Sequence, residues 1–302
     1  MIPSNIIFGF VLISQMYVGF IGNSLLFVFY VYIYFIQSHL RKSIDLIFMH
    51  LTLVNVLAIT FMFTLDILPS FGVRNALNDV GCKAILYINR VTRGVSICVT
   101  SLLSMVQAIT ISPRNSKWAW IKSKLSMCIF PSFLSFWILN MLVYVHLIDA
   151  VIARTNVTMV GPGYSQAYCQ TKIGNLPSHS FMSVIAIRDL LFVVLMICTS
   201  LYMVSVLHRH HRTVQHLHSP SFSSQPSPED KATHSILVLV SCFVLFYGLS
   251  NVMTLYMFYT PQKKTELGKI AGILSSCYPT LCPFVLMKHS KIISRFFPSL
   301  LR

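Results

Sequence analysis

The sequence predicts an all-α integral membrane protein in which one domain, 1–302, forms a bundle of seven transmembrane helices. The first observation is that seven long apolar stretches fill most of the chain. The second is the composition: 55% of the residues are hydrophobic and 10% are charged, whereas about a quarter of a soluble domain is charged. The third is that Lys and Arg residues gather in alternate connections between the apolar stretches. This pattern is typical of a chain that crosses a membrane repeatedly.

Each span is predicted from its length and hydropathy, because roughly 20 apolar residues are needed to cross a bilayer core with every backbone polar group satisfied. The first span follows a short segment without a basic region or a cleavage site, so we expect it to remain as an anchor. The last span contains Pro279 and Pro283, so we expect much of its surface to face other helices or a wet cavity. In order, the predicted spans are 8–34, 44–68, 84–111, 125–148, 184–207, 233–258 and 267–287.

The first two spans carry polar side chains within their apolar sequence. Asn23 in the first span and Asn55 in the second can hydrogen-bond across helices. We therefore expect these two amides to form an interhelical polar core. Asp66 lies near the outer end of the second span.

The third and fifth spans carry ionisable residues, which are costly in lipid and normally face the protein interior. Arg90 and Arg93 are three residues apart in the third span and share a helix face, while Arg188 and Asp189 lie near the outer end of the fifth. On one interpretation Arg90 and Arg93 pair with Asp66 and Asp189 and fix the helix positions. On the other, at least one arginine is available to an anionic or acceptor group of a ligand. The ligand-binding hypothesis includes Asp66, Asn89, Arg90, Arg93, Arg188 and Asp189.

The distribution of the basic residues predicts the orientation of the bundle. Thirteen Lys and Arg residues lie in one set of connections and seven in the other. By the positive-inside rule the N-terminus is then extracellular and the C-terminus cytoplasmic, with a flexible cytoplasmic loop at 208–232 and a cytoplasmic tail at 288–302. Because membrane spans separate the basic residues, the net charge of +15 does not indicate a nucleic-acid-binding face.

The long outer connection at 149–183 carries two further signals. Asn156-Val157-Thr158 is an acceptor sequence for N-glycosylation, which takes place on the lumenal side. Of eight cysteines, Cys82 and Cys169 lie at the predicted outer loops, where an oxidising compartment permits a disulfide. Such a disulfide would tie the connection to the start of the third helix. The alternative is a pair of free thiols.

No motif indicates an enzyme, because the chain has no metalloprotease, nucleophile-elbow or phosphate-loop pattern. A histidine-rich run at 208–218 could bind zinc, but it lacks nearby Cys or carboxylate ligands. We expect it to be the basic end of the fifth helix, facing lipid headgroups or a partner protein. The sequence predicts no metal and no cofactor.

Several short strings of the chain are distinctive when taken together. They include Arg90-Val91-Thr92-Arg93-Gly94-Val95-Ser96, Gln107-Ala108-Ile109-Thr110, Pro113-Arg114-Asn115-Ser116, Trp137-Ile138-Leu139-Asn140, Ser227-Pro228-Glu229 and Pro279-Thr280-Leu281. On these strings the chain resembles, over almost its whole length, the vomeronasal type 1 receptors, which are rhodopsin-like G-protein-coupled pheromone receptors. Two common rhodopsin-like motifs are missing: Met105-Val106-Gln107 stands where Asp-Arg-Tyr would end the third helix, and the seventh helix has no Asn-Pro-x-x-Tyr.

The resemblance implies that a small pheromone-like molecule enters the bundle from outside and that a heterotrimeric Gi-type protein reads the change inside. It also implies the plasma membrane of vomeronasal sensory neurons. A steroid or sulfated steroid would suit a pocket that contains arginine. We hypothesise that Arg114, Lys117, Arg209 and Arg212 face the G protein, the alternative being contact with membrane lipid.

Two other functions remain open from the sequence. A bitter-taste-type receptor has a similarly short N-terminus and a glycosylated second loop, but such receptors generally lack a bridge of the Cys82 to Cys169 type. A small-molecule transporter is expected to show repeated halves and broken helices around a midplane site. Neither feature is apparent here, and seven spans do not divide into equal halves.

Overall fold

The computed structural model describes residues 4–37, 42–67, 71, 77–113, 119–153, 169–171, 179–217, 228–259 and 264–289. Within these ranges seven helices are long and apolar enough to cross a membrane. They are α1 (Ser4–Phe35), α2 (Ser43–Met62), α4 (Asp79–Ile111), α5 (Ala119–Tyr144), α7 (His179–Leu217), α8 (Pro228–Tyr259) and α9 (Lys264–His289). The shorter elements are a π-helical turn η2 (Phe63–Ile67), α6 (Leu147–Ala150), β1 (Val151–Ala153) and β2 (Cys169–Thr171).

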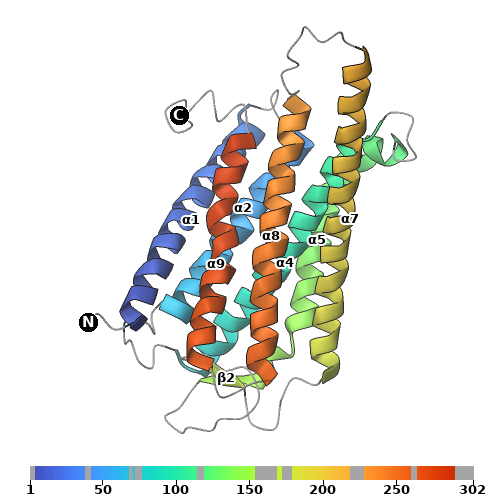
Figure 1. Cartoon of the computed structure of the whole chain (residues 1–302). Coiled ribbons are helices and arrows are strands. Elements are labelled where there is room, and N and C mark those ends of the chain that lie inside the picture. The colour runs from blue at the N-terminus through green and yellow to red at the C-terminus, as the bar shows by residue number, and fades with distance from the viewer. Residues whose placement is uncertain are drawn as a thin grey trace.

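The seven long helices lie side by side and alternate in direction, so that α1 begins at the end of the bundle where β2 lies and α9 ends at the opposite end (Figure 1). Helix α4 is the central one, since it packs against α2, α5, α7 and α8. In its most apolar stretch 78% of the residues are buried, compared with 11% in α7. The fold predicted from the sequence, a seven-helix membrane bundle, is confirmed.

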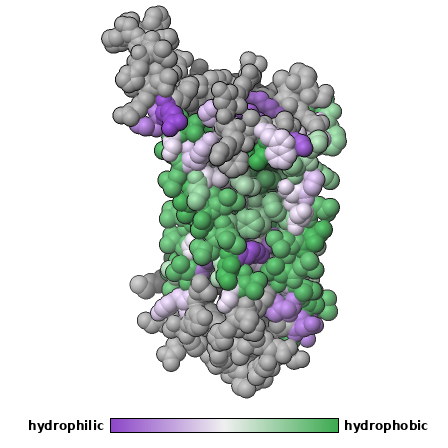
Figure 2. Space-filling model, turned by 90° about the vertical axis from the view of Figure 1, so that its right-hand side faces the viewer, coloured by the Kyte–Doolittle hydropathy of each residue, from purple (hydrophilic) through white to green (hydrophobic). Residues whose placement is uncertain are grey.

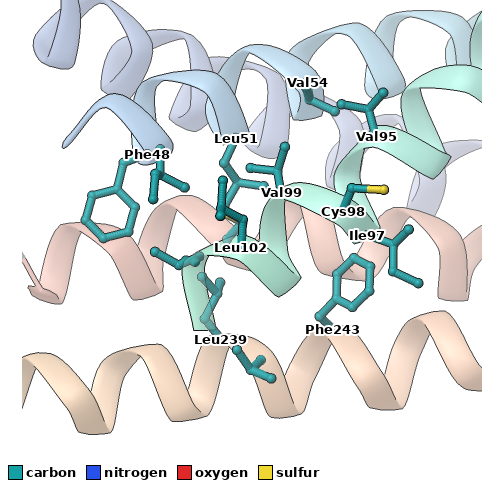
Figure 3. Packing of buried hydrophobic residues seen from close by; sticks show 14 of the residues in the cluster. Phe48, Leu51, Val54, Val95, Ile97, Cys98, Val99, Leu102, Leu239 and Phe243 are labelled. Atoms are coloured by element: carbon teal, nitrogen blue, oxygen red, sulfur yellow. The ribbon is translucent and has the colours of Figure 1, made fainter. Parts of the chain in front are cut away.

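The main apolar core fills the space between α2, α4 and α8. Leu51 of α2 lies close to Val99 and Leu102 of α4 there, with Phe48 of α2 to one side and Phe243 of α8 to the other (Figure 3). All five side chains are buried. Their helices therefore form the packed interior beside the polar groups in the half of the bundle that carries β1 and β2.

The outside of the bundle is apolar around its middle. Figure 2 shows a hydrophobic band on one face, with hydrophilic residues toward both ends. Large apolar side chains in the membrane helices are well exposed, among them Leu25, Val28, Leu191 and Leu201, at 63 to 67%. Such a belt would be unfavourable in water and suits the hydrocarbon region of a bilayer.

Helices α1 and α9 approach closely, and the sequence shows why. A β-carbon added to Gly22 would lie 2.8 Å from Cγ of Pro283, so only glycine fits there. Pro283 has no N–H, so the carbonyl of Pro279 receives no helical hydrogen bond from it. Asn23 Nδ2 donates to that carbonyl at 2.8 Å, and Asn55 Nδ2 donates to Asn23 Oδ1 at 3.2 Å. The two amides thus join α1, α2 and α9 through a carbonyl that proline leaves exposed.

A short antiparallel hairpin of β1 and β2 lies at the end of the bundle where α4 begins (Figure 1). Cys82 of α4 and Cys169 of β2 form a disulfide with Cα atoms 5.6 Å apart. The carboxylate of Asp79 accepts a hydrogen bond of 2.6 Å from the backbone N–H of Ala153, which lies opposite Cys169 in the hairpin. The hairpin is therefore fixed to the first turn of α4 at two points.

Several helix ends differ from the predicted spans. Helix α7 continues from the predicted end at Leu207 to Leu217, and α8 begins at Pro228, before the predicted start at Thr233. In the second span the α-helix ends at Met62, and the π-helical turn η2 continues the helix to Ile67. The backbone of Asp66 lies in this turn, and its side chain lies outside the described part of the structure.

Candidate ligand-binding cluster within the bundle

A buried polar cluster joins α4, α5, α7, α8 and α9 in the half of the bundle that carries the hairpin. At a rise of about 1.5 Å per residue, Arg93 lies roughly 16 Å along α4 from Cys82. The cluster therefore lies about three helical turns from the disulfide. Its members are Arg93, Asn140, Tyr144, Arg188, Asp189, Tyr247, Ser250, Asn251 and Ser275.

The centre of the polar cluster is an ion pair between neighbours on α7. Arg188 and Asp189 are each only 8% exposed. The guanidinium turns back so that Nη2 and Nε both donate to Asp189 Oδ1, at 2.6 and 3.0 Å. The second carboxylate oxygen, Oδ2, accepts a hydrogen bond of 2.7 Å from the hydroxyl of Tyr247. Removing one partner would leave the other as an uncompensated buried charge, which is strongly destabilising.

Arg188 also connects α7 to α5. Its Nη1 donates to Asn140 Oδ1 at 2.7 Å, and Nη2 donates to the hydroxyl of Tyr144 at 2.9 Å. Asn140 in turn donates to the backbone carbonyl of Phe136 at 2.8 Å. The amide of Asn140 can approach α4 this closely because Gly94 has no side chain: an added β-carbon would overlap Asn140 Oδ1.

The second arginine of the cluster, Arg93, is held differently. It is half-buried and donates to Ser275 Oγ at 3.2 Å, to Ser250 Oγ at 2.9 Å and to Asn251 Oδ1 at 3.1 Å. Its guanidinium carbon lies 4.9 Å from the centre of the Tyr247 ring, a cation–π contact. These partners, among the residues that the structure describes, are all neutral. Hydrogen bonds to neutral dipoles orient the charge without cancelling it.

Tyr247 joins the two halves of the cluster. Its hydroxyl donates to Asp189, and its ring face contacts Arg93. The ring also stacks on Phe243, with centroids 5.0 Å apart, in the apolar core below. A displacement of Arg93 would therefore shift Tyr247, and through it the ion pair on α7 and the core between α4 and α8.

The structure brings together three of the residues that the sequence singles out, namely Arg93, Arg188 and Asp189. Asp189 pairs with its own neighbour Arg188, and not with Arg93. Asn89 and Arg90 lie on the same helix as Arg93 and are half-buried. The predicted pair of Arg93 with Asp189 is therefore not formed. The two residues are connected indirectly through Tyr247.

Most of the neutral members of the cluster do not stand out in the sequence. Asn140 is visible as an amide inside an apolar span, the same signal that identifies Asn23 and Asn55. Tyr247 and Tyr144 give a weaker signal, because tyrosine is common in membrane helices whichever way it faces. Asn251, inside the span 233–258, gives the same amide signal as Asn140, whereas Ser250 and Ser275 become recognisable only once α8 and α9 are placed around Arg93.

Of the remaining predicted residues, the structure describes the surroundings of Arg209. Asn156, Arg114 and Lys117 fall outside the described residues, as does the side chain of Arg212. Arg209 is exposed near the far end of α7. Within the described ranges no group of three or more His, Cys, Asp or Glu side chains could hold a metal ion.

Comparison with known proteins gives one family along almost the entire chain. A family model described as the vomeronasal organ pheromone receptor family matches residues 6–299. Vomeronasal type-1 receptor 4 of Homo sapiens is 37% identical, covering 94% of this chain and 95% of the relative. Vomeronasal type-1 receptor 94 of Rattus norvegicus is 36% identical, with coverages of 95% and 87%. Olfactory receptor class A-like protein 1 of Danio rerio is 29% identical, with coverages of 90% and 86%.

The matched region contains the disulfide, every member of the polar cluster and all seven long helices, apart from the first two residues of α1. The apolar belt and the seven helices make the protein a multi-pass membrane protein. The residues that carry the resemblance in the sequence, such as Arg93 and Asn140, are thus placed in one buried site of a seven-helix bundle. The chain belongs to the vomeronasal organ pheromone receptor family, the chemosensory receptors of vomeronasal type 1.

Proposed function

We propose that this receptor binds a small pheromone-like molecule at Arg93, within the bundle, and that binding activates a heterotrimeric G protein of the Gi type. One observation supports the ligand site above all others. Arg93 is a charged, half-buried group on the central helix, and its contacts among the described residues are with neutral oxygens and one aromatic ring. A ligand with an anionic or strongly accepting group would gain a charge-assisted hydrogen bond there.

The surroundings favour a ligand that is mostly apolar. The cluster sits on the aromatic and aliphatic core that includes Phe243 and Tyr247. A steroid with a sulfate or another acidic group combines a rigid apolar body with one anion, and thus matches this arrangement. Because Arg188 is already paired with Asp189, we assign the recognition of the anion to Arg93 and the fixing of helix positions to the ion pair.

The orientation of the bundle follows from the disulfide and the distribution of basic residues. A stable disulfide requires an oxidising compartment, so the Cys82 and Cys169 end is assigned to the outside, together with the N-terminus and Asn156 as a glycosylation site. The opposite end then faces the cytoplasm, and the basic residues that we place against the G protein there are Arg114, Lys117, Arg209 and Arg212. The proposed location is the plasma membrane of vomeronasal sensory neurons. The family assignment argues against the bitter-type and transporter alternatives.

The test is pertussis-toxin-sensitive signalling by surface-expressed receptor, challenged with pairs of steroids that differ only in a sulfate or a hydroxyl. The expected result is a toxin-blocked response that prefers the sulfated member. Arg93→Gln should reduce that preference about tenfold or more, because a hydrogen bond to a charged group is worth about 1.5–3 kcal/mol. The response to the neutral member should fall by less. Arg209→Gln tests the G-protein contact in the same assay, and should lower the maximal response without changing the ligand preference.

Lys83→Gln is the matched control for Arg93→Gln, because it removes one positive charge from the same end of α4 outside the polar cluster. It should leave the ligand preference unchanged. Equal losses for sulfated and neutral ligands in Arg93→Gln, at normal surface level, would assign Arg93 a structural role only. A ligand response that persists in the presence of the toxin would exclude coupling through Gi.

A further inference from the structure

A small hollow lies at the end of the bundle opposite the disulfide, and the proposed ligand site does not use it. Its volume is about 110 Å³, which exceeds the roughly 30 Å³ share of one water molecule in the liquid and would accommodate a phosphate-sized group. We call it the α1–α2–α5 hollow. It is lined by Tyr34, Lys42, Ser43, Leu46, Ser126 and Ile129.

The hollow lies at the level where these helices leave the apolar layer. Tyr34 is next to the last residue of α1, Ser43 is the first residue of α2, and the membrane-length stretch of α5 begins at Lys124, two residues before Ser126. Lys124 stacks on the exposed ring of Trp120, at 4.8 Å from its centroid. Tryptophan and lysine in this arrangement are typical of the boundary between the headgroups and the acyl chains.

The lining combines donors for an anion with an apolar floor. Ser43 Oγ and Ser126 Oγ lie 2.5 Å apart. Two hydroxyls that share one hydrogen bond retain a second O–H hydrogen that can be donated outward. Lys42 contributes an ammonium group with three donors, and Leu46 and Ile129 close the hollow on its apolar side.

Among the lining residues the charged side chain is Lys42, whose charge the carboxylate of Asp45 partly offsets. The nearest carboxylate along the chain, Asp45, does not line the hollow, and its Oδ2 accepts a hydrogen bond of 2.8 Å from the backbone N–H of Lys42. This contact fixes the backbone where α2 begins and so places Lys42 at the rim. On the α5 side, Met127 and Phe130 are 71% and 70% exposed, and present apolar surface where acyl chains would lie.

We propose that the α1–α2–α5 hollow binds the phosphate of an anionic phospholipid headgroup, with its acyl chains lying along Met127 and Phe130 of α5. Lys42 neutralises the phosphate, and the Ser43 and Ser126 pair donates a hydrogen bond to it. A bound lipid would hold the ends of α1, α2 and α5 in a fixed arrangement at the membrane surface. The proposal depends on the geometry of this end of the bundle and not on the identity of the chemosensory ligand.

The test is lipid retention by purified receptor, counted by native mass spectrometry after exposure to phosphatidic acid or phosphatidylcholine with the same acyl chains. The wild-type chain should retain phosphatidic acid preferentially. Lys42→Gln should reduce that preference about fivefold, the effect of one basic residue near a membrane surface. Ser126→Leu should reduce it without any change in charge, because the larger side chain fills the hollow and removes a hydroxyl.

Lys122→Gln is the matched control, since Lys122 lies at the same end of the bundle, donates to the carbonyl of Thr110 at 2.7 Å and does not line the hollow. It should retain phosphatidic acid as the wild type does. An equal loss in Lys122→Gln would show diffuse attraction to the basic surface and overturn the site. Displacement of the lipid by millimolar inorganic phosphate would equally overturn it, because the hollow would then bind free phosphate and not a lipid.

Discussion

At the scale of single residues, the polar cluster depends on a position that has no side chain. Gly94 leaves room on α4 for the amide of Asn140, which accepts a hydrogen bond from Arg188. Gly94→Ala should displace this amide and strain the ion pair on α7. We expect a loss of about 1–3 kcal/mol, the usual cost of overpacking a dense interior, measured as a lower thermal unfolding temperature of the purified receptor.

Gly248 provides the matched control for this substitution, because it is also in a membrane helix and an added β-carbon would meet nothing within 4 Å. Gly248→Ala should be neutral or slightly stabilising, since alanine has the higher helix propensity. The smaller Asn140→Ser should restore much of the stability of Gly94→Ala by removing the overlap. Equal behaviour of the two alanine variants would contradict this account of Gly94.

The charged members of the cluster could be predicted from the sequence, and their pairing could not. An arginine or aspartate inside an apolar span faces the interior whatever the details, so Arg93, Arg188 and Asp189 stand out. Which groups meet depends on the rotation of each helix about its axis. Rotation decides that Arg188 reaches Asn140 and that Tyr247 stands between Arg93 and Asp189. Hydropathy carries little information on the rotation of a helix, because the outer faces and the core of the bundle are both apolar.

At the scale of elements, α1 and α9 are joined where proline interrupts the hydrogen bonding of a helix. The carbonyl of Pro279 has no helical donor because residue 283 is proline, and Asn23 supplies a hydrogen bond of 2.8 Å instead. Asn23→Ala should therefore destabilise the receptor by about 0.6–2 kcal/mol, the range for hydrogen bonds between membrane helices. The measurement is thermal unfolding in detergent.

A double-substitution cycle isolates this contact. Pro283→Ala restores a backbone N–H that can donate to the carbonyl of Pro279, so Asn23→Ala should cost less in that background. The contact of Pro283 with Gly22 is lost in both Pro283→Ala variants and cancels from the cycle. Purely additive effects would show that Asn23 acts through its other partners, Gly19 and Asn55.

The number of membrane helices was predictable, but their ends were less so. Hydropathy detects contact with lipid, which stops near Leu207 in α7, whereas helical hydrogen bonding continues to Leu217. The polar run after 207 can remain helical in water, because Arg, Gln and Leu are good helix formers. The π-helical turn after Met62 could not be predicted either, because its wider hydrogen-bonding pattern does not change the hydropathy of the second span.

At the scale of the whole molecule, the two ends of the bundle are held together by different chemistry. At the end near the disulfide, a charged cluster joins five helices. Toward the other end, the described contacts of α4 with α7 and α8 include single neutral hydrogen bonds. Gln107 Nε2 donates to Thr233 Oγ1 of α8 at 3.1 Å, and the hydroxyls of Ser112 and Tyr202 of α7 lie 2.8 Å apart. The hydrogen bonds described at the Gln107 end are thus between neutral groups, whereas those at the other end include an ion pair.

This asymmetry predicts how a ligand bound at Arg93 could act on the opposite end of the bundle. If activation requires α8 to move away from α4, weakening the Gln107 to Thr233 hydrogen bond should favour the active arrangement without ligand. A neutral hydrogen bond contributes about 1 kcal/mol, which corresponds to a roughly fivefold change in the equilibrium. Thr233→Val should therefore raise ligand-independent, toxin-sensitive signalling several-fold at equal surface expression.

Thr60→Val is the control, because the hydroxyl of Thr60 donates within α2, to the carbonyl of Val56, and is exposed to lipid. Unchanged or lower basal signalling in Thr233→Val would place the moving contact elsewhere, whereas a rise confined to Thr233→Val would connect the neutral end of α4 to activation.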